Sequence, residues 1–75
     1  MKQEIIEIIA CVLKVDASEV ELDTAIGDLD EWDSLHHLQI IAEIEQKYQI
    51  KFEQADLAEL EDVSDLISLA EGLRK

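Results

Sequence analysis

The start of the chain alternates between apolar and polar residues with a helical period. Its apolar positions are Ile5, Ile6, Ile8, Ile9, Val12 and Leu13. Because an α-helix turns once in about 3.6 residues, positions three and four apart share one face. The pattern predicts a first helix from about Lys2 to Lys14, with this face against a core. The periodicity fades at Val15 and Asp16.

Residues 16–33 show no sustained period and predict a long loop. Four apolar residues are expected to pin this loop to the core: Val20, Leu22, Ile26 and Leu29. Ser18 is followed three residues later by Glu21, a capping-box spacing that predicts one short helical turn inside the loop. Long ordered loops in small domains are commonly functional, so this segment is a candidate for function.

A second helix is predicted to begin at Asp33 and Ser34, both favourable N-cap residue types, and to run to about Tyr48. Its apolar stripe consists of Leu35, Leu38, Ile41, Ala42 and Tyr48, widened by Ile40 and Ile44. After this helix, Ile50 and Phe52 alternate with Lys51. Two residues without a partner strand predict an extended connector whose side chains are buried.

Two further helices are predicted, a short one from Asp56 to Leu60 and a longer one that follows Asp62 as its N-cap. The apolar side of the last helix consists of Val63, Leu66, Ile67, Leu69, Ala70 and Leu73. The expected fold is all-α. It is a small four-helix bundle of three longer helices and one short helix, with a long loop between helices 1 and 2. Residues 1–75 form one domain.

Composition narrows the class of function. The chain has 75 residues, with 19 Asp plus Glu against 6 Lys plus Arg and a formal net charge of −13. This charge repels nucleic-acid phosphates and anionic membranes and favours basic protein partners. No apolar run approaches the about 18 residues of a membrane helix, and the N-terminus is too acidic for a signal peptide. We therefore expect a cytoplasmic protein, and a monomer.

The acidic residues gather in two segments, 16–34 and 53–71, and the first of these contains no Lys or Arg. They form either an ordinary solvated surface or a docking surface for basic patches, and composition leaves both interpretations open. The single cysteine, Cys11, cannot form an internal disulfide and is expected to be an inert thiol in the core.

Ser34 places a hydroxyl at the predicted N-terminus of the second helix. There it can cap a backbone amide, or carry a phosphate or phosphodiester near free amides and the positive end of the helix dipole. A catalytic Ser34–His37 pair is a weaker hypothesis, because the sequence lacks a Gly-x-Ser-x-Gly elbow. No specific metal site is expected. His36 and His37 diverge around the helix, and residues 28–31 lack the later ligands of a calcium loop.

The segment Asp33-Ser34-Leu35 resembles the modification motif of the acyl carrier proteins and of the carrier domains of polyketide and nonribosomal peptide assembly. The resemblance continues through Ala42-Glu43-Ile44-Glu45-Gln46-Lys47-Tyr48, Ile50 and Phe52. Supporting matches are Val15, Val20, Leu22, Asp23, Ile26-Gly27-Asp28-Leu29 and Asp62-Val63-Ser64-Asp65-Leu66. It covers nearly the whole chain.

The resemblance implies that a phosphopantetheinyl transferase attaches 4′-phosphopantetheine from coenzyme A to Ser34. The thiol of that arm would carry acyl groups as thioesters in fatty acid, polyketide or other specialised biosynthesis. The protein would present them to acyl-loading, acyl-modifying and acyl-transfer enzymes with basic docking surfaces, without catalysing a step itself. Recognition roles are implied for Asp33, Leu35 and Glu45. The ordinary alternatives are an N-cap, a core side chain and a solvated charge, respectively.

The chain departs from fatty-acid carriers beside the motif. Trp32 replaces a small residue, and the form Trp-Asp-Ser-Leu-x-His, which ends at His37, is similar to stand-alone carriers of specialised pathways. We expect Trp32 to anchor the loop. His36 and Gln39 stand where those carriers tend to have acids, which suggests dedicated partners. The rival hypothesis is an acidic helical interaction module without a covalent group, which leaves the placement of the motif unexplained.

Overall fold

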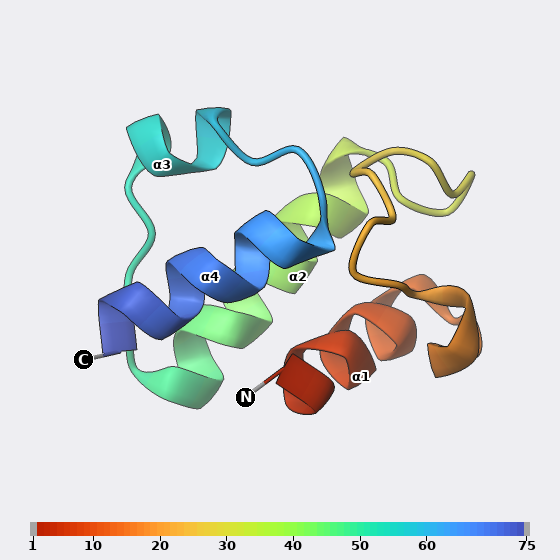
Figure 1. Cartoon of the computed structure of the whole chain (residues 1–75), viewed down its shortest axis with the longest axis horizontal. Helices are drawn as coiled ribbons and strands as arrows, with labels where there is room; N and C mark the ends of the chain where they lie inside the picture. The colour runs from red at the N-terminus through yellow and green to blue at the C-terminus, as the bar shows by residue number, and fades with distance from the viewer. Residues whose placement is uncertain (1, 75) are drawn as a thin grey trace.

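The structure, a computed structural model, describes residues 2–74 and is all-α (Figure 1). Helix α1 spans Lys2–Leu13, the 3₁₀ turn η1 Ala17–Glu19, α2 Ser34–Tyr48, α3 Gln54–Ala58 and α4 Val63–Arg74. The predicted fold class is confirmed, with three longer helices, one short helix and a long loop between α1 and α2. Helix α3 begins and ends two residues earlier than the sequence predicts.

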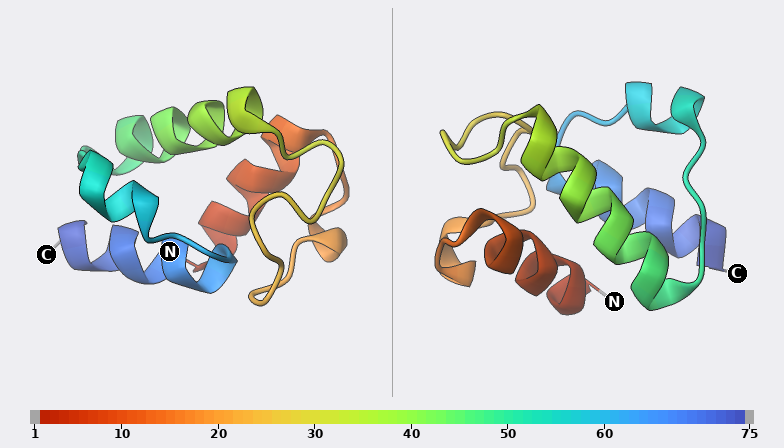
Figure 2. Two further views of the ribbon diagram at one scale, coloured as in Figure 1. Left: turned by 90° about the horizontal axis from the view of Figure 1, so that it is seen from above. Right: turned by 180° about the vertical axis from the view of Figure 1, so that it is seen from behind.

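The three longer helices surround a single core. From above, α2 and α4 run along opposite edges of the molecule with α1 between them, and α3 lies on the side away from α1 (Figure 2). The largest fully buried side chains come from all three of these helices: Ile5 and Ile9 from α1, Ile40 and Ile44 from α2, and Val63 and Leu66 from α4. Phe52 is buried in the extended segment after α2, as predicted.

The long loop is held by backbone pairing with the segment that precedes α4. The Ile26 amide donates to the Glu61 carbonyl at 2.9 Å, and the Val63 amide donates to the Thr24 carbonyl at 3.1 Å. An isolated antiparallel bridge joins Ala25 to Asp62 between these bonds. The pairing ties the loop to the rest of the bundle, whereas the loop's own backbone bonds are short turns such as that from the Asp28 amide to the Ala25 carbonyl.

Three of the four predicted loop anchors contact the core. Val20 is buried, and Ile26 and Leu29 are half-buried against it, whereas Leu22 is 39% exposed. Leu22 instead helps to hold the loop through its backbone, because its carbonyl accepts a hydrogen bond from the Ser64 amide at 2.9 Å. The loop is therefore pinned to the bundle as expected, with one anchor misassigned.

The helical turn inside the loop begins two residues earlier than predicted, so the expected capping by Ser18 and Glu21 is wrong. The Asp16 carboxylate accepts the Ser18 amide at 3.1 Å, and the Asp16 amide donates to the Glu19 carboxylate at 3.1 Å. This reciprocal pair is the capping box of η1. It prevails because an aspartate at the N-cap satisfies the free amides at least as well as a serine.

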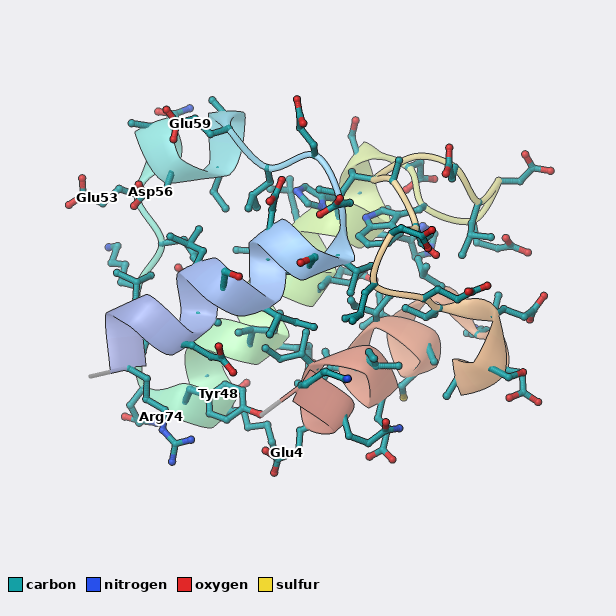
Figure 3. The ribbon with its side chains drawn as sticks, viewed as in Figure 1. Glu4, Tyr48, Glu53, Asp56, Glu59 and Arg74 are labelled. Atoms are coloured by element: carbon teal, nitrogen blue, oxygen red, sulfur yellow. The ribbon has the colours of Figure 1, made fainter. Side chains whose placement is uncertain are left out.

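The N-terminal end of α1 and the C-terminal ends of α2 and α4 meet around Tyr48, the last residue of α2 (Figure 3). The Tyr48 hydroxyl donates to the Glu4 carboxylate at 3.0 Å, and the Arg74 guanidinium lies 5.3 Å from the ring centre. The hydroxyl of Tyr48 lowers the pKa of Glu4, and burial followed by this bond raises the pKa of Tyr48. This cluster ties the bundle together at the end of α2 opposite Ser34.

Cys11 is exposed, which corrects the prediction of a core thiol. Helix α1 buries Ile5, Ile9 and Leu13, and a residue two positions beyond Ile9 lies about 200° around the helix from it. We expect Cys11 to react with an aromatic disulfide reagent in the folded protein at a rate close to that in denaturant. The measurement uses the Ser34→Ala variant, with Cys11→Ser as control. Protection in the folded state would contradict this geometry.

Candidate functional site

The N-terminus of α2 is capped by Asp33. Its carboxylate oxygen accepts the backbone amide of His36 at 2.9 Å and lies 2.8 Å from Nδ1 of the same residue. The bond from the His36 amide, followed by the contact with its side chain, holds the pKa of Asp33 below its ordinary value. Asp33 is therefore the N-cap, and it also keeps a charged carboxylate next to Ser34.

Ser34 is the first residue of α2 and is exposed. Because Asp33 supplies the cap, the Ser34 hydroxyl is not required to satisfy the helix end. Within residues 2–74, no hydrogen bond joins this hydroxyl to His36 or His37, which bind Asp33 and Trp32 instead. The pairing that a serine nucleophile needs is not formed, so the geometry does not favour the hypothesis of a catalytic serine.

Trp32 anchors the end of the loop, as predicted. Its side chain is 3% exposed, although Glu31 and Asp33 on either side are exposed. The indole N–H donates to Nδ1 of His37 at 3.1 Å, and the two ring centres lie 6.1 Å apart. Burial lowers the pKa of His37, because a half-buried imidazole is less well solvated when charged.

Two leucines of α2 lie on the solvent side, which corrects the predicted stripe. Leu35 is 63% and Leu38 61% exposed, and Ala42 is exposed with them. The buried residues of α2 are Ile40, Ile41 and Ile44. Positions 35, 38 and 42 share one face, and position 44 lies about 180° from position 35.

The core alternative for Leu35 is therefore wrong, and Leu35 offers an exposed apolar contact close to Ser34. Leu38 is a second exposed leucine that the sequence prediction missed, because it was assigned to the core. Leu38 follows Leu35 by three residues, so the two side chains share one helix face, and the exposure of one implies the exposure of the other. Leu35 and Leu38 together place two largely exposed leucines on the face of α2 that begins beside Ser34.

Glu45 has a role that neither alternative foresaw. Its half-buried carboxylate accepts the Phe52 backbone amide at 2.8 Å and so holds the extended connector against the end of α2. One of its two oxygens is engaged inside the protein. It lies eleven positions beyond Ser34, near the Tyr48 end of the helix.

The acidic side chains of residues 2–74 do not gather into a metal-binding cluster. Glu53, Asp56 and Glu59 lie around α3, far from the Glu4–Tyr48 pair (Figure 3). In the described part of the chain, no group of three or more His, Cys, Asp or Glu side chains is placed to hold a metal ion. Over the same residues, no helix is both long and apolar enough to cross a membrane.

Comparison with known proteins identifies the family. The model of the phosphopantetheine attachment site family matches residues 3–70. An acyl carrier protein from Streptococcus pneumoniae serotype 4 is 41% identical over 73 residues, which cover 97% of this chain and 95% of that protein. The acyl carrier protein of Onion yellows phytoplasma is 34% identical over 87% of this chain and 86% of its own.

The solution NMR structure of a holo acyl carrier protein from Geobacter metallireducens shares the fold with a TM-score of 0.86 and 32% sequence identity. The match covers 96% of this chain and 83% of that one. The chain therefore belongs to the phosphopantetheine-bearing acyl carrier proteins. These proteins carry acyl groups on a covalent 4′-phosphopantetheine and deliver them to acyl-handling enzymes, and they are carriers rather than catalysts. The rival hypothesis of a module without a covalent group is not favoured.

Proposed function

We propose that Ser34 is the residue to which 4′-phosphopantetheine is attached. The observation that carries this proposal is an exposed serine at the first position of α2 whose helix end is already capped by the neighbouring Asp33. Ser34 also lies inside the region that the family model matches, residues 3–70.

The surroundings of Ser34 fit such a group. The hydroxyl is open to solvent, so an extended arm needs no cavity in the protein. The first turn of α2 presents amides and the positive end of the helix dipole, which favour the negative charge of a phosphodiester. When bound, the group supplies a thiol that forms thioesters with acyl groups. This chain's own contribution is to expose, orient and deliver it.

The partners that follow are a phosphopantetheinyl transferase and the enzymes that load, modify and remove the acyl group. We propose that Asp33 and Leu35 contact these enzymes, since one offers a charge and the other an exposed apolar side chain on either side of Ser34. Glu45 is the weaker member of this set, because the Phe52 amide occupies one of its oxygens. The protein itself catalyses no step, and we propose that it acts as a monomer in the cytoplasm.

Intact mass spectrometry tests the attachment site. We expect the purified chain, incubated with coenzyme A and a phosphopantetheinyl transferase of broad specificity, to gain the mass of one 4′-phosphopantetheine. Ser34→Ala is expected to gain nothing, because it removes the only atom that accepts the group.

The matched control is Ser64→Ala. Ser64 is also an exposed serine in the first turn of a helix, α4, and its own amide is held by the Leu22 carbonyl. We expect this variant to be modified as completely as the unaltered chain. Modification of Ser34→Ala, or its loss in Ser64→Ala alone, would place the attachment site elsewhere.

A further inference from the structure

The hydrogen bond between Trp32 and His37 spans the residue that accepts the arm. Trp32 precedes Ser34 by two positions in the loop, and His37 follows it by three in the first turns of α2. The bond from indole Nε1 to imidazole Nδ1, at 3.1 Å, therefore links the two residues that flank the segment containing Asp33 and Ser34. The last anchored residue of the loop is joined to the helix across the modification site.

The bond is directional. An indole nitrogen only donates, so Nδ1 of His37 must be the acceptor, and the neutral imidazole carries its proton on Nε2. Trp32 is 3% exposed, so its N–H has no ready replacement partner in water. The buried indole thus fixes both the tautomer and the orientation of His37.

The two histidines of the motif differ in what they do. His36 contacts Asp33, whose carboxylate is already held by the His36 backbone amide, so this side chain adds to an existing cap. His37 instead provides the acceptor for a side chain that otherwise has no bond across Ser34. On the loop side, the Trp32 amide is in turn held by the Leu29 carbonyl at 2.9 Å.

We propose that His37 is a positioning residue for the modification of Ser34: by accepting the Trp32 indole N–H, it fixes the end of the loop against α2 and presents the Ser34 hydroxyl in one orientation. The proposal rests on Ser34 being the attachment site. His37 does not touch the reacting atoms, and it acts through Trp32 and the backbone between them. The transferase then meets a preorganised serine rather than a mobile loop end.

A pair of isosteric substitutions separates this role from simple packing. In His37→Asn the side-chain oxygen takes the place of Nδ1 as acceptor, whereas His37→Leu has nearly the same shape and no acceptor. Leucine is the better helix former and the more apolar residue, so a packing role predicts that His37→Leu is at least as stable as His37→Asn. If His37 positions Ser34, we expect the transferase to modify His37→Asn faster than His37→Leu.

The experiment measures kcat/KM of the phosphopantetheinyl transferase for each variant, together with thermal unfolding. We expect kcat/KM to fall roughly fivefold in His37→Leu, as loss of one net hydrogen bond predicts, and to recover to within about twofold in His37→Asn. Equal rates for His37→Leu and the unaltered chain would overturn the proposal. Equal losses in both variants would also overturn it if the Trp32 indole N–H of His37→Asn exchanges as slowly as that of the unaltered chain.

A second readout reports the bond itself. Trp32 is the only tryptophan in the chain, so the ¹H–¹⁵N spectrum contains one indole N–H signal. We expect this signal to exchange slowly with water in the unaltered chain and in His37→Asn, and measurably faster in His37→Leu. Unchanged exchange in His37→Leu would contradict the bond shown by the structure.

Removal of the donor keeps the test decisive if asparagine does not reach the indole. Trp32→Phe is expected to lower kcat/KM by a similar factor, and His37→Leu is expected to add little in the Trp32→Phe background. Independent, multiplicative losses would overturn the proposal. Ser34→Ala in the same assay tests the attachment site separately from the positioning role of His37. Its modification would refute the attachment site, whereas the indole exchange would still report on Trp32 and His37.

Discussion

Ile44→Ala is expected to lower the free energy of unfolding by about 2–5 kcal/mol, and Leu38→Ala to change it by no more than about 0.5 kcal/mol. Both residues lie on α2, but Ile44 is completely buried and Leu38 is 61% exposed. Truncation at Ile44 loses burial and leaves a cavity, whereas truncation at Leu38 removes a side chain that already contacts water.

The loss at Ile44 is large for a chain of 75 residues. Domains of this size are stable by roughly 4–11 kcal/mol, so Ile44→Ala removes a substantial part of the total. Urea denaturation followed by far-ultraviolet circular dichroism measures both variants. Similar losses at the two positions would mean that Leu38 belongs to the core, as the sequence pattern alone predicts. Weaker binding of partner enzymes by stable Leu38→Ala would support the exposed leucines as a contact surface.

Association with a basic phosphopantetheinyl transferase is expected to slow about tenfold or more as the ionic strength rises from about 0.01 to 0.15 M. Over this range the screening length falls from about 30 to 8 Å. The net charge of −13 attracts a basic partner from a distance only while it is unscreened. Stopped-flow fluorescence of the encounter at several salt concentrations measures the rate.

A pair of single-charge variants locates the steering surface. Glu31 is exposed in the loop three residues before Ser34, and Glu71 is exposed in the last turns of α4, next to the Tyr48 end of the bundle. We expect Glu31→Gln to reduce the association rate roughly twofold at low salt, and Glu71→Gln to have a smaller effect. Equal effects would show that the acidic residues act through net charge alone, as the solvated-surface interpretation of the composition holds.

Local signals in the sequence were sufficient to predict the three longer helices. Helical periodicity and N-cap residues located α1, α2 and α4, since these features depend on residues three or four positions apart. The buried Phe52 and the Trp32 anchor were also predicted, because large apolar side chains in a polar segment have few other places to go.

The features that the sequence did not predict depend on contacts between distant segments. The pairing of Ala25 with Asp62 joins residues far apart in the chain, and no local pattern marks it. The buried face of α2 is chosen by its packing on α1 and on the shared core, so the apolar pattern, which contains leucines and isoleucines on both faces, did not identify it. Glu45 was misread for the same reason, because its acceptor role requires the chain to return after α2.

At the candidate site, the sequence predicted the residues but not their bonds. Asp33, Ser34 and Leu35 follow from the motif, and the structure adds that Asp33 takes the cap and leaves Ser34 free of it. The Trp32–His37 bond lay outside the prediction, because adjacent histidines in a helix give no indication of which one turns toward the loop.

The location of the covalent group tests the central claim most directly. The modified protein, digested and fragmented in a mass spectrometer, is expected to carry 4′-phosphopantetheine on the peptide that contains Ser34, with the fragment series placing it on the Ser34 side chain. The same group found on Ser18, Ser64 or Ser68, or a chain that no phosphopantetheinyl transferase modifies, would contradict the assignment of Ser34 as the attachment site.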